Sequence, residues 1–207
     1  MSHVKVEIAS QPDCWREAAK LAGRAGLPVR GERVAVAGCG TSWFIAQAYA
    51  GLREEEGHGE TDAFQASEFP RGRRYDRVLV ISRSGTTTEA VDLLRELDGI
   101  TPTTVITADP ETPVVPLAGE AIVLDFADEL SVVQTRFATS TLALLRAHLG
   151  HDIEALAADG EVAVRLPLPV HPALAKQVTF LGRGWTVGLA REAALKCREA
   201  AGWWAEA

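Results

Sequence analysis

Two short apolar runs, each followed by a turn rich in glycine and hydroxyl residues, constrain the fold of this chain more than any other feature. Residues 33–38 (RVAVAG) and 77–81 (RVLVI) have the length and apolar character of buried strands. A segment with helical character follows each turn, at residues 43–56 and Thr87–Leu97. Three further strands are expected, at residues 61–66, 103–107 and 121–125. Strands that alternate with helices predict an α/β fold with a doubly wound parallel sheet.

The rest of the chain predicts additional helices and a second, shorter unit. Helices are expected at residues 13–23, 131–149 and 190–204. The proline-rich segment 165–172 (RLPLPVHP) indicates a linker, and VTFLGRG (178–184) then repeats the strand and Gly-x-Gly pattern of VAVAGCG (34–40). We therefore expect four parts: an N-terminal helical segment (1–30), the sheet domain (31–150), a linker or helix (151–172) and the incomplete start of a second similar unit (173–207).

Charge and composition narrow the classes of function. The chain has 207 residues and a formal net charge of −7, which disfavours binding to nucleic acid or to an anionic membrane surface. No apolar run is long enough to cross a bilayer. The three cysteines (Cys14, Cys39 and Cys197) form no CxxC pair, and the histidines lack the spacing of metal ligands. We expect a cytoplasmic protein without a metal or cofactor.

The turn after the strand at 77–81 predicts a phosphate site. The segment SRSGTTTE (82–89) places several hydroxyls between a buried strand and a helix. A helix N-terminus has free backbone N–H groups and a partial positive charge, so it suits a phosphate group. Gly85 would let the backbone approach the anion, and Ser82, Ser84 and Thr87 would hold it.

Three other interpretations of these turns stay open to different degrees. Thr86 and Glu89 have the spacing of a capping box, which would use two of these side chains without any ligand. A Walker loop needs a lysine that the turn lacks. A dinucleotide-binding turn after the strand at 33–38 needs a third glycine where Trp43 stands, although Asp62 could contact a ribose.

Five stretches of this sequence, in order, resemble the sugar isomerase (SIS) domain family, and in particular the isomerase half of the glucosamine-6-phosphate synthases. They are EIASQP (7–12), AGCGTS (37–42), ASEFPR (66–71) with ISRSGTTTEAV (81–91), ELSVVQTRFAT (129–139), and LGRG (181–184) with EAALKCREA (192–200). The resemblance spans almost the whole chain and implies a phosphorylated sugar of the fructose 6-phosphate or glucosamine 6-phosphate class as ligand.

The resemblance also implies roles for individual residues. The implied contacts to the sugar hydroxyls are Cys39, Gly40, Thr41 and Ser42, and those to the phosphate are Ser82, Arg83, Ser84, Gly85 and Thr87. Val132 and Val133 match positions whose backbone lies near the sugar. Glu199 matches the general base, with Glu192 and Lys196 beside it in the site.

The chain departs from the family pattern at several positions. Arg83, Gln134 and Arg136 stand where the synthase-like members carry glutamine, serine and lysine. The glutaminase half is absent, so the resemblance implies no use of glutamine. The family continues past Ala207 into a segment with a ring-opening histidine and a final lysine, so we expect the C-terminal part of the site to be missing.

The charged face of the last expected helix and Cys39 also have simple structural explanations. At about 100° per residue, Glu192, Lys196 and Glu199 share one face of the expected helix, opposite a stripe of apolar residues that ends at Trp204. That face could be a solvated surface with an i, i+4 ion pair, whereas the resemblance makes it catalytic. Cys39 could be a nucleophile, but a small residue in a tight turn is the favoured explanation.

These observations predict a phosphosugar-binding protein. The expected reaction is aldose–ketose isomerisation or amino-sugar phosphate deamination, both of which need one group that moves a proton between neighbouring carbons. A non-catalytic sugar-phosphate sensor is the alternative. The apolar content after residue 172, with Trp185, Trp203 and Trp204, predicts a homodimer.

Overall fold

The computed structural model describes residues 2–168, 171 and 175–207. Its centre is a five-stranded, fully parallel sheet with the order β2-β1-β3-β4-β5. The strands are β1 (Val34–Gly38), β2 (Thr61–Gln65), β3 (Arg77–Ile81), β4 (Thr103–Thr107) and β5 (Glu120–Val123). Short 3₁₀ turns follow two of them, η1 (Ala66–Glu68) and η2 (Asp125–Ala127). The predicted α/β class with a doubly wound parallel sheet is confirmed.

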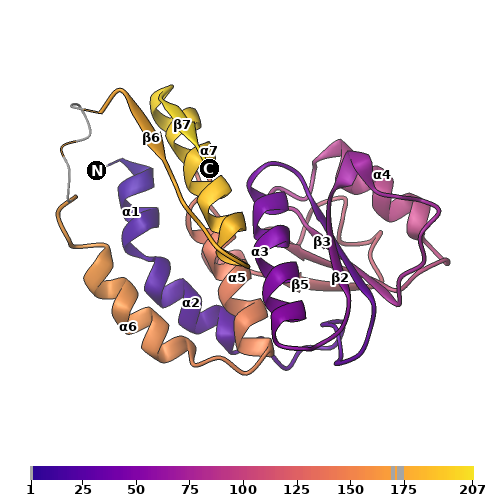
Figure 1. The fold of residues 1–207 in the computed structure, drawn as a ribbon. Helices are drawn as coiled ribbons and strands as arrows, with labels where there is room; N and C mark the ends of the chain where they lie inside the picture. The colour runs from indigo at the N-terminus through magenta and orange to yellow at the C-terminus, as the bar shows by residue number, and fades with distance from the viewer. Residues whose placement is uncertain (1, 169–170, 172–174) are drawn as a thin grey trace.

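Helices cover both faces of this sheet (Figure 1), and alternate residues of each strand serve the two faces. Val34 and Val36 of β1 pack toward α3 (Thr41–Glu55) and α5 (Arg136–His148). Ala35 and Ala37 pack toward α4 (Thr88–Leu97) on the opposite face. All four side chains are fully buried. Burial on both faces explains why the strands are continuous apolar runs instead of alternating patterns.

The N-terminal segment adds an outer layer of helices on the α5 side. It contains α1 (His3–Ala9) and α2 (Gln11–Ala19), and α2 packs against both α5 and α6 (Ile153–Ala163). Trp15 Nε1 donates a hydrogen bond of 2.9 Å to Thr139 Oγ1 of α5. The helix predicted at 13–23 begins earlier because Pro12 fits its first turn, where a missing N–H costs nothing.

The C-terminal segment forms a strand, a helix and a second strand. β6 (Gln177–Thr179) pairs in parallel with β7 (Trp204–Glu206), and α7 (Thr186–Ala201) connects them. The helix predicted at 190–204 is therefore wrong at its end, because Gly202 adopts a left-handed conformation that terminates α7. Trp204 lies in β7 and not on the apolar stripe of the helix. The predicted linker 165–172 lies partly outside the described residues.

A close approach of two helices fixes this C-terminal segment to the sheet domain. A Cβ atom on Gly188 of α7 would lie only 2.6 Å from the backbone of Phe44 and Ala48 in α3. Glycine therefore lets α7 pack directly on α3, the helix that follows β1 (Figure 1). The strand–turn–helix pattern seen twice in the sequence thus occurs twice in the structure, with the two helices in contact.

One predicted helix begins later than expected. Residues 131–149 were predicted to be helical, but α5 covers only Arg136–His148. Residues 131–135 belong to a loop instead, and the buried carboxylate of Glu129 accepts the backbone N–H groups of Thr135 and Arg136 at the start of α5. The loop 128–135 becomes part of the candidate site.

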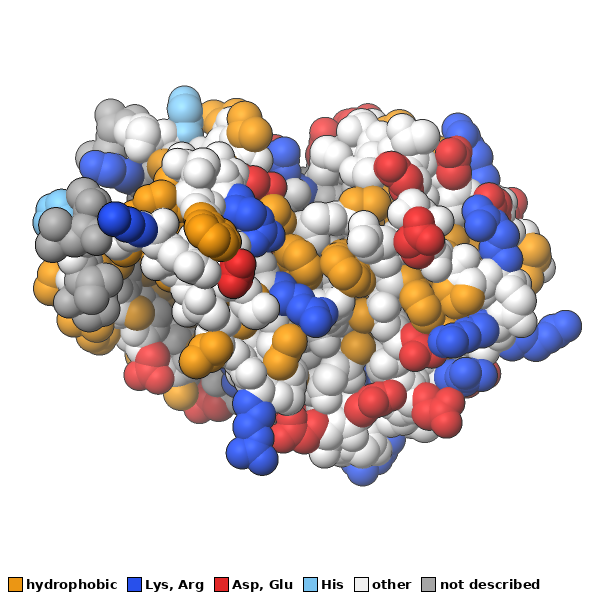
Figure 2. Space-filling model, turned by 45° about the horizontal axis from the view of Figure 1, so that its top comes forward, with side chains coloured by type: hydrophobic (Ala, Val, Ile, Leu, Met, Phe, Trp, Pro, Cys, Tyr) orange, Lys and Arg blue, Asp and Glu red, His pale blue; other side chains and the backbone are white. Residues whose placement is uncertain are grey.

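The surface carries charges of both signs. In Figure 2, acidic, basic and hydrophobic side chains are interspersed over the visible face, and the surface is hollowed at the top between the two halves of the view. Within the described ranges, no helix combines the length and the apolar character needed to cross a bilayer.

Candidate functional site

A small polar cavity lies where the strand order reverses. From β1 the chain runs through α3 to β2 on one side of β1, and it then crosses to β3 on the other side. The carboxyl ends of β1 and β3 are therefore neighbours, with Gly38 paired to Ile81. Ligands of doubly wound sheets bind at such points. The cavity there has a volume of about 60 Å³ and is lined by Cys39, Ser42, Ile81, Ser82, Arg83, Ser84, Thr87, Ala90 and Gln134.

The residues that line the cavity contribute three buried polar atoms that have no hydrogen-bond partner among the described residues. They are Ser82 Oγ, Arg83 Nε and Gln134 Oε1. A buried polar group without a partner destabilises a fold by about 1–3 kcal/mol, so most native proteins satisfy such groups. Three in one cavity indicate a site built to hydrogen-bond a polar ligand.

The guanidinium group of Arg83 is fixed at the edge of this cavity. Its Nη1 donates a hydrogen bond of 2.7 Å to the carbonyl of Glu129 and lies 3.4 Å from Asp128 Oδ1. The side chain is only 21% exposed. These contacts leave Nε free to donate toward a ligand, so Arg83 supplies positive charge without needing to reorient.

The N-terminus of α4 contributes further donors to the same end of the sheet. Its first backbone bonds run from Ala90 and Val91 to the carbonyl of Thr87. Within the described chain, no backbone carbonyl accepts from the N–H groups of Thr88 and Glu89, as expected for the first turn of a helix. The helix therefore presents its positive end close to Thr87, which lines the cavity.

The capping box that was the alternative explanation is not formed. No side chain caps the start of α4, and Thr86 Oγ1 instead donates to Ser84 Oγ at 3.1 Å. The cavity is also of suitable size. About 10–15 Å³ is enough for one water molecule, so about 60 Å³ fits a group of several atoms such as a phosphoryl group but not a whole hexose.

Gly85 has a different role from the expected one. Gly85 is not one of the residues that line the cavity. Its φ angle of +59° lies in the left-handed region, and a Cβ atom there would lie 2.1 Å from Thr112 Oγ1. Glycine is needed so that the turn can bend and pack against the 109–112 loop. The turn is thereby held in the shape that directs Ser82 and Ser84 at the cavity.

The turn after β1 supplies the other wall. Ser42 and Cys39 line the cavity, whereas Gly40 and Thr41 do not, although Thr41 is buried beside them. Burial raises the pKa of the Cys39 thiol, so it stays protonated at neutral pH. A protonated thiol is a poor nucleophile, which favours the turn-residue interpretation of Cys39.

The loop 128–135 contributes one residue to the cavity lining, and it is neither of the two valines whose backbone is expected near the sugar. Val132 is 95% exposed, and neither Val132 nor Val133 lines the cavity. Gln134 of the same loop does line it. Sequence reasoning noted Gln134 only as a departure from the family pattern, and its position beside two predicted contact residues was the available signal.

A buried carboxylate from the N-terminal segment holds this loop in place. Glu7 Oε1 accepts the backbone N–H groups of Leu130 at 2.8 Å and Ser131 at 3.1 Å. Burial favours a higher pKa for Glu7, but these hydrogen bonds outweigh it and lower the pKa. Arg136 also donates to Ser10 Oγ. The two sequence stretches that begin at residues 7 and 129 thus meet in space, which sequence alone did not reveal.

The three charged residues of α7 form one cluster, although its members differ in exposure. Lys196 Nζ lies 2.6 Å from Glu199 Oε2 and 3.6 Å from Glu192 Oε1. The side chains of Glu192 and Lys196 are 19% exposed and that of Glu199 is 41% exposed, so this face is not a fully solvated surface. Burial raises the pKa of Glu192 to about 7, against the attraction of Lys196. A carboxyl group that titrates near neutrality suits acid–base chemistry.

Comparisons with known proteins give structural likeness without sequence matches. No family model matches the chain, and no curated protein matches its sequence. A Silicibacter pomeroyi protein described as a phosphosugar isomerase has a TM-score of 0.80 at 21% identity, over 100% of this chain and 71% of that one. Glucosamine-6-phosphate deaminase from Thermotoga maritima has a TM-score of 0.77 at 21% identity, over 98% and 68%. The C-terminal domain of the glucosamine-fructose-6-phosphate aminotransferase from Francisella tularensis has a TM-score of 0.74 at 20% identity, over 100% and 69%.

Proposed function

We propose that this chain, whose fold is that of the phosphosugar isomerases, binds a phosphorylated sugar with its phosphate in the cavity between Ser82 and Gln134. The observation that carries the proposal is a pair of buried donors without a hydrogen-bond partner among the described residues, Ser82 Oγ and Arg83 Nε, on residues that line one small cavity at the positive end of α4. The Ser82 hydroxyl and the Arg83 guanidinium can donate hydrogen bonds to phosphate oxygens, whereas Gln134 Oε1 can only accept, so it suits a hydroxyl group of the ligand.

The sugar ring would extend out of the cavity, because the ring exceeds its volume. The proposed contacts to the sugar come from the turn after β1 and from the loop 128–135. The ligand belongs to the fructose 6-phosphate or glucosamine 6-phosphate class, since structurally similar proteins include a glucosamine-6-phosphate deaminase and an aminotransferase named for fructose 6-phosphate.

The proposed chemistry is proton transfer between neighbouring sugar carbons, as in aldose–ketose isomerisation or amino-sugar phosphate deamination. Glu199 is the proposed base, by its match to the family pattern. Lys196 Nζ lies 2.6 Å from Glu199 Oε2 and places a positive charge beside the proposed base. Glu192 then acts as the neighbouring acid, because its pKa of about 7 leaves it partly protonated at neutral pH.

Ligand-dependent thermal stability tests the binding proposal. A ligand that binds only the folded state stabilises it by about 2.7 kcal/mol at a hundred times its dissociation constant. Fructose 6-phosphate or glucosamine 6-phosphate should raise the melting temperature, and fructose or glucosamine at the same concentration should do so much less. Equal shifts with and without the phosphate group would refute a phosphate site.

Hydrogen exchange at the sugar tests the chemistry. Wild-type protein in deuterated water should exchange the C1 or C2 hydrogen of the bound sugar phosphate, observed by NMR. Glu199→Gln should slow this exchange by roughly 10²- to 10⁴-fold while binding persists, because the phosphate is held elsewhere. Wild-type exchange in Glu199→Gln would remove Glu199 from the mechanism. Binding without exchange in either protein would favour the sugar-phosphate sensor.

A further inference from the structure

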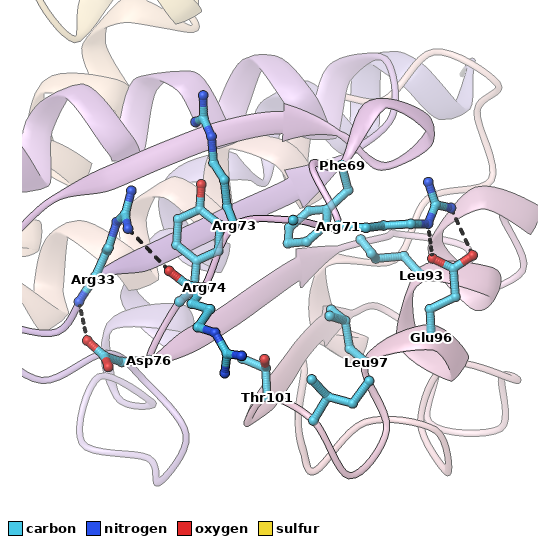
Figure 3. A pocket seen from close by; sticks show the side chains of 13 residues that line it. Arg33, Phe69, Arg71, Arg73, Arg74, Asp76, Leu93, Glu96, Leu97 and Thr101 are labelled. Carbon is cyan, nitrogen blue, oxygen red and sulfur yellow. Dashed lines mark hydrogen bonds and ion pairs between the residues drawn. The ribbon is translucent and has the colours of Figure 1, made fainter.

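A second, larger pocket opens at the opposite edge of the sheet, near the amino ends of the strands. It has a volume of about 870 Å³, and its lining includes Arg33 before β1, Asp76 before β3 and Thr101 before β4 (Figure 3). Strands of five residues span roughly 16 Å at about 3.3 Å per residue. The pocket is therefore separate from the phosphate cavity at the carboxyl ends of β1 and β3.

Arginine side chains dominate this pocket in an otherwise acidic chain. Arg33, Arg71, Arg73 and Arg74 all line it, and three of them come from the short segment 71–74 (RGRR). The carboxylates in the lining are those of Asp76 and Glu96. Guanidinium groups recognise phosphate oxygens through paired hydrogen bonds, so such a cluster suits a phosphate group.

The arginines differ in how strongly carboxylates of the protein already bind their guanidinium groups. Arg71 holds Glu96 through two hydrogen bonds of 2.7 and 2.8 Å, but both side chains are exposed, at 68% and 42%. Such surface pairs contribute little, so a ligand phosphate can compete with them. Arg74 is exposed and makes no ion pair among the residues that the structure describes, and its side chain extends toward the Thr101 side of the pocket in Figure 3.

The remaining two arginines are held by carboxylates outside the centre of the pocket. Arg33 pairs with Glu60 at 3.1 Å and lies over the ring of Tyr75, and Arg73 pairs with Asp62 at 3.4 Å. These pairs are also largely exposed. Arg74 is therefore the residue through which an added anion would gain most.

The floor between these arginines is apolar. Phe69 and Leu93 are buried beneath it, Leu97 is half-buried, and Ile100 is 75% exposed at its rim. A fully hydrated anion would gain no binding free energy from contact with this apolar surface. A ligand that combined a phosphate with an apolar or aromatic body would bury that surface and could also stack on a guanidinium plane.

We propose that this pocket binds a phosphate monoester with an apolar or aromatic body, in which Arg74 holds the phosphate and Leu97 and Ile100 contact the body. Sugar phosphates fit this site poorly, because their hydroxyl-bearing bodies would lie on the apolar floor. The pocket is thus a second ligand site that differs from the proposed sugar-phosphate site in both place and selectivity.

The probe for this site is 1-naphthyl phosphate, with binding measured by calorimetry on the purified protein. We expect saturable binding of one molecule per chain, and binding of inorganic phosphate and of 1-naphthol at least about tenfold weaker, because each supplies only half of the interaction. Fructose 6-phosphate should not displace the probe. Absence of saturable binding at millimolar 1-naphthyl phosphate would overturn the proposal.

Variants separate a built site from general charge attraction. Arg74→Gln should weaken 1-naphthyl phosphate binding about tenfold, the effect of one charge-assisted hydrogen bond. Arg95→Gln is the matched control, because Arg95 is exposed on α4, pairs with Asp92 and does not line the pocket. Equal weakening in Arg95→Gln and Arg74→Gln would refute the site, and so would loss of probe binding in Ser82→Ala.

Discussion

Replacement of Glu192 by glutamine should change how the stability of the protein depends on pH. Burial raises the pKa of Glu192 from 4.5 to about 7. Since one pKa unit corresponds to about 1.4 kcal/mol, the ionised carboxylate destabilises the fold by about 3 kcal/mol relative to the protonated form. That pKa already includes the attraction of Lys196.

The sign follows from proton linkage. Between pH 4.5 and about 7, the folded state retains a proton that the unfolded state has lost, so stability falls as pH rises through this window. Below pH 4.5 both states are protonated and the penalty is absent. Above about pH 7 it is fully present. Glutamine is neutral at every pH and has nearly the same shape, so Glu192→Gln should lack this slope.

Urea unfolding at pH 5 and pH 8 measures the effect. The free energy of unfolding of Glu192→Gln should exceed that of the wild type by up to about 3 kcal/mol at pH 8 and by little at pH 5. Glu17→Gln, at an exposed position of α2, is the control and should follow the wild type at both values. If Glu192→Gln kept the wild-type difference between the two pH values, the carboxyl group would not be poised near neutrality.

Three other substitutions should lower the free energy of unfolding, measured by urea titration. Arg53→Met should lower it by about 3 kcal/mol or more, because the fully buried guanidinium donates to Thr61 Oγ1 and to three backbone carbonyls that would lose their donor; a loss below about 1 kcal/mol would contradict this. Gly85→Ala should lower it by about 2 kcal/mol or more, since φ is +59° and the added Cβ would clash with Thr112; an unchanged midpoint would mean that the turn can adapt. Asp152→Ala should lower it by about 1 kcal/mol through loss of the N-cap of α6, unless its bond to Ala155 N is dispensable.

The strands were predictable because their signal is local. A strand buried on both faces is a continuous apolar run, and residues 34–38 and 78–81 have that property. The sequence signal of the turns that follow these strands is also local, because small and hydroxyl residues cluster there. The position of the cavity at the carboxyl ends of β1 and β3 followed from the topology.

The errors in the helices have tertiary causes. Apolar Val132 and Val133 continue a helical pattern, but residues 131–135 form a loop. Glu129 beside this loop and Glu7 from the distant N-terminal segment accept the backbone N–H groups around it. The end of α7 was placed too late because Trp204 fits an apolar stripe, whereas its backbone pairs with β6. Contacts between segments far apart in sequence decide both cases.

The site likewise combines features with a local sequence signal and features that depend on tertiary packing. Ser82, Ser84 and Thr87 were visible as a cluster of hydroxyls, and the structure places all three in the cavity lining. Gln134 follows Val132 and Val133, two expected contact positions, but the sequence does not show which side chain of this loop faces the cavity. The near-neutral pKa of Glu192 depends on how deeply α7 is buried, and a helical pattern shows only which residues share a face.

The affinity of a serine variant for a sugar phosphate tests the central claim most directly. Ser82 and Ser140 are both buried serines with unpartnered hydroxyls, but only Ser82 lines the cavity. The measurement is the dissociation constant, by calorimetry, for whichever of fructose 6-phosphate and glucosamine 6-phosphate binds the wild type more tightly. Ser82→Ala should bind at least about tenfold more weakly, since a hydrogen bond to a charged phosphate is lost, and Ser140→Ala should bind like the wild type. Equal affinities in the wild type and both variants would contradict a phosphate site at Ser82.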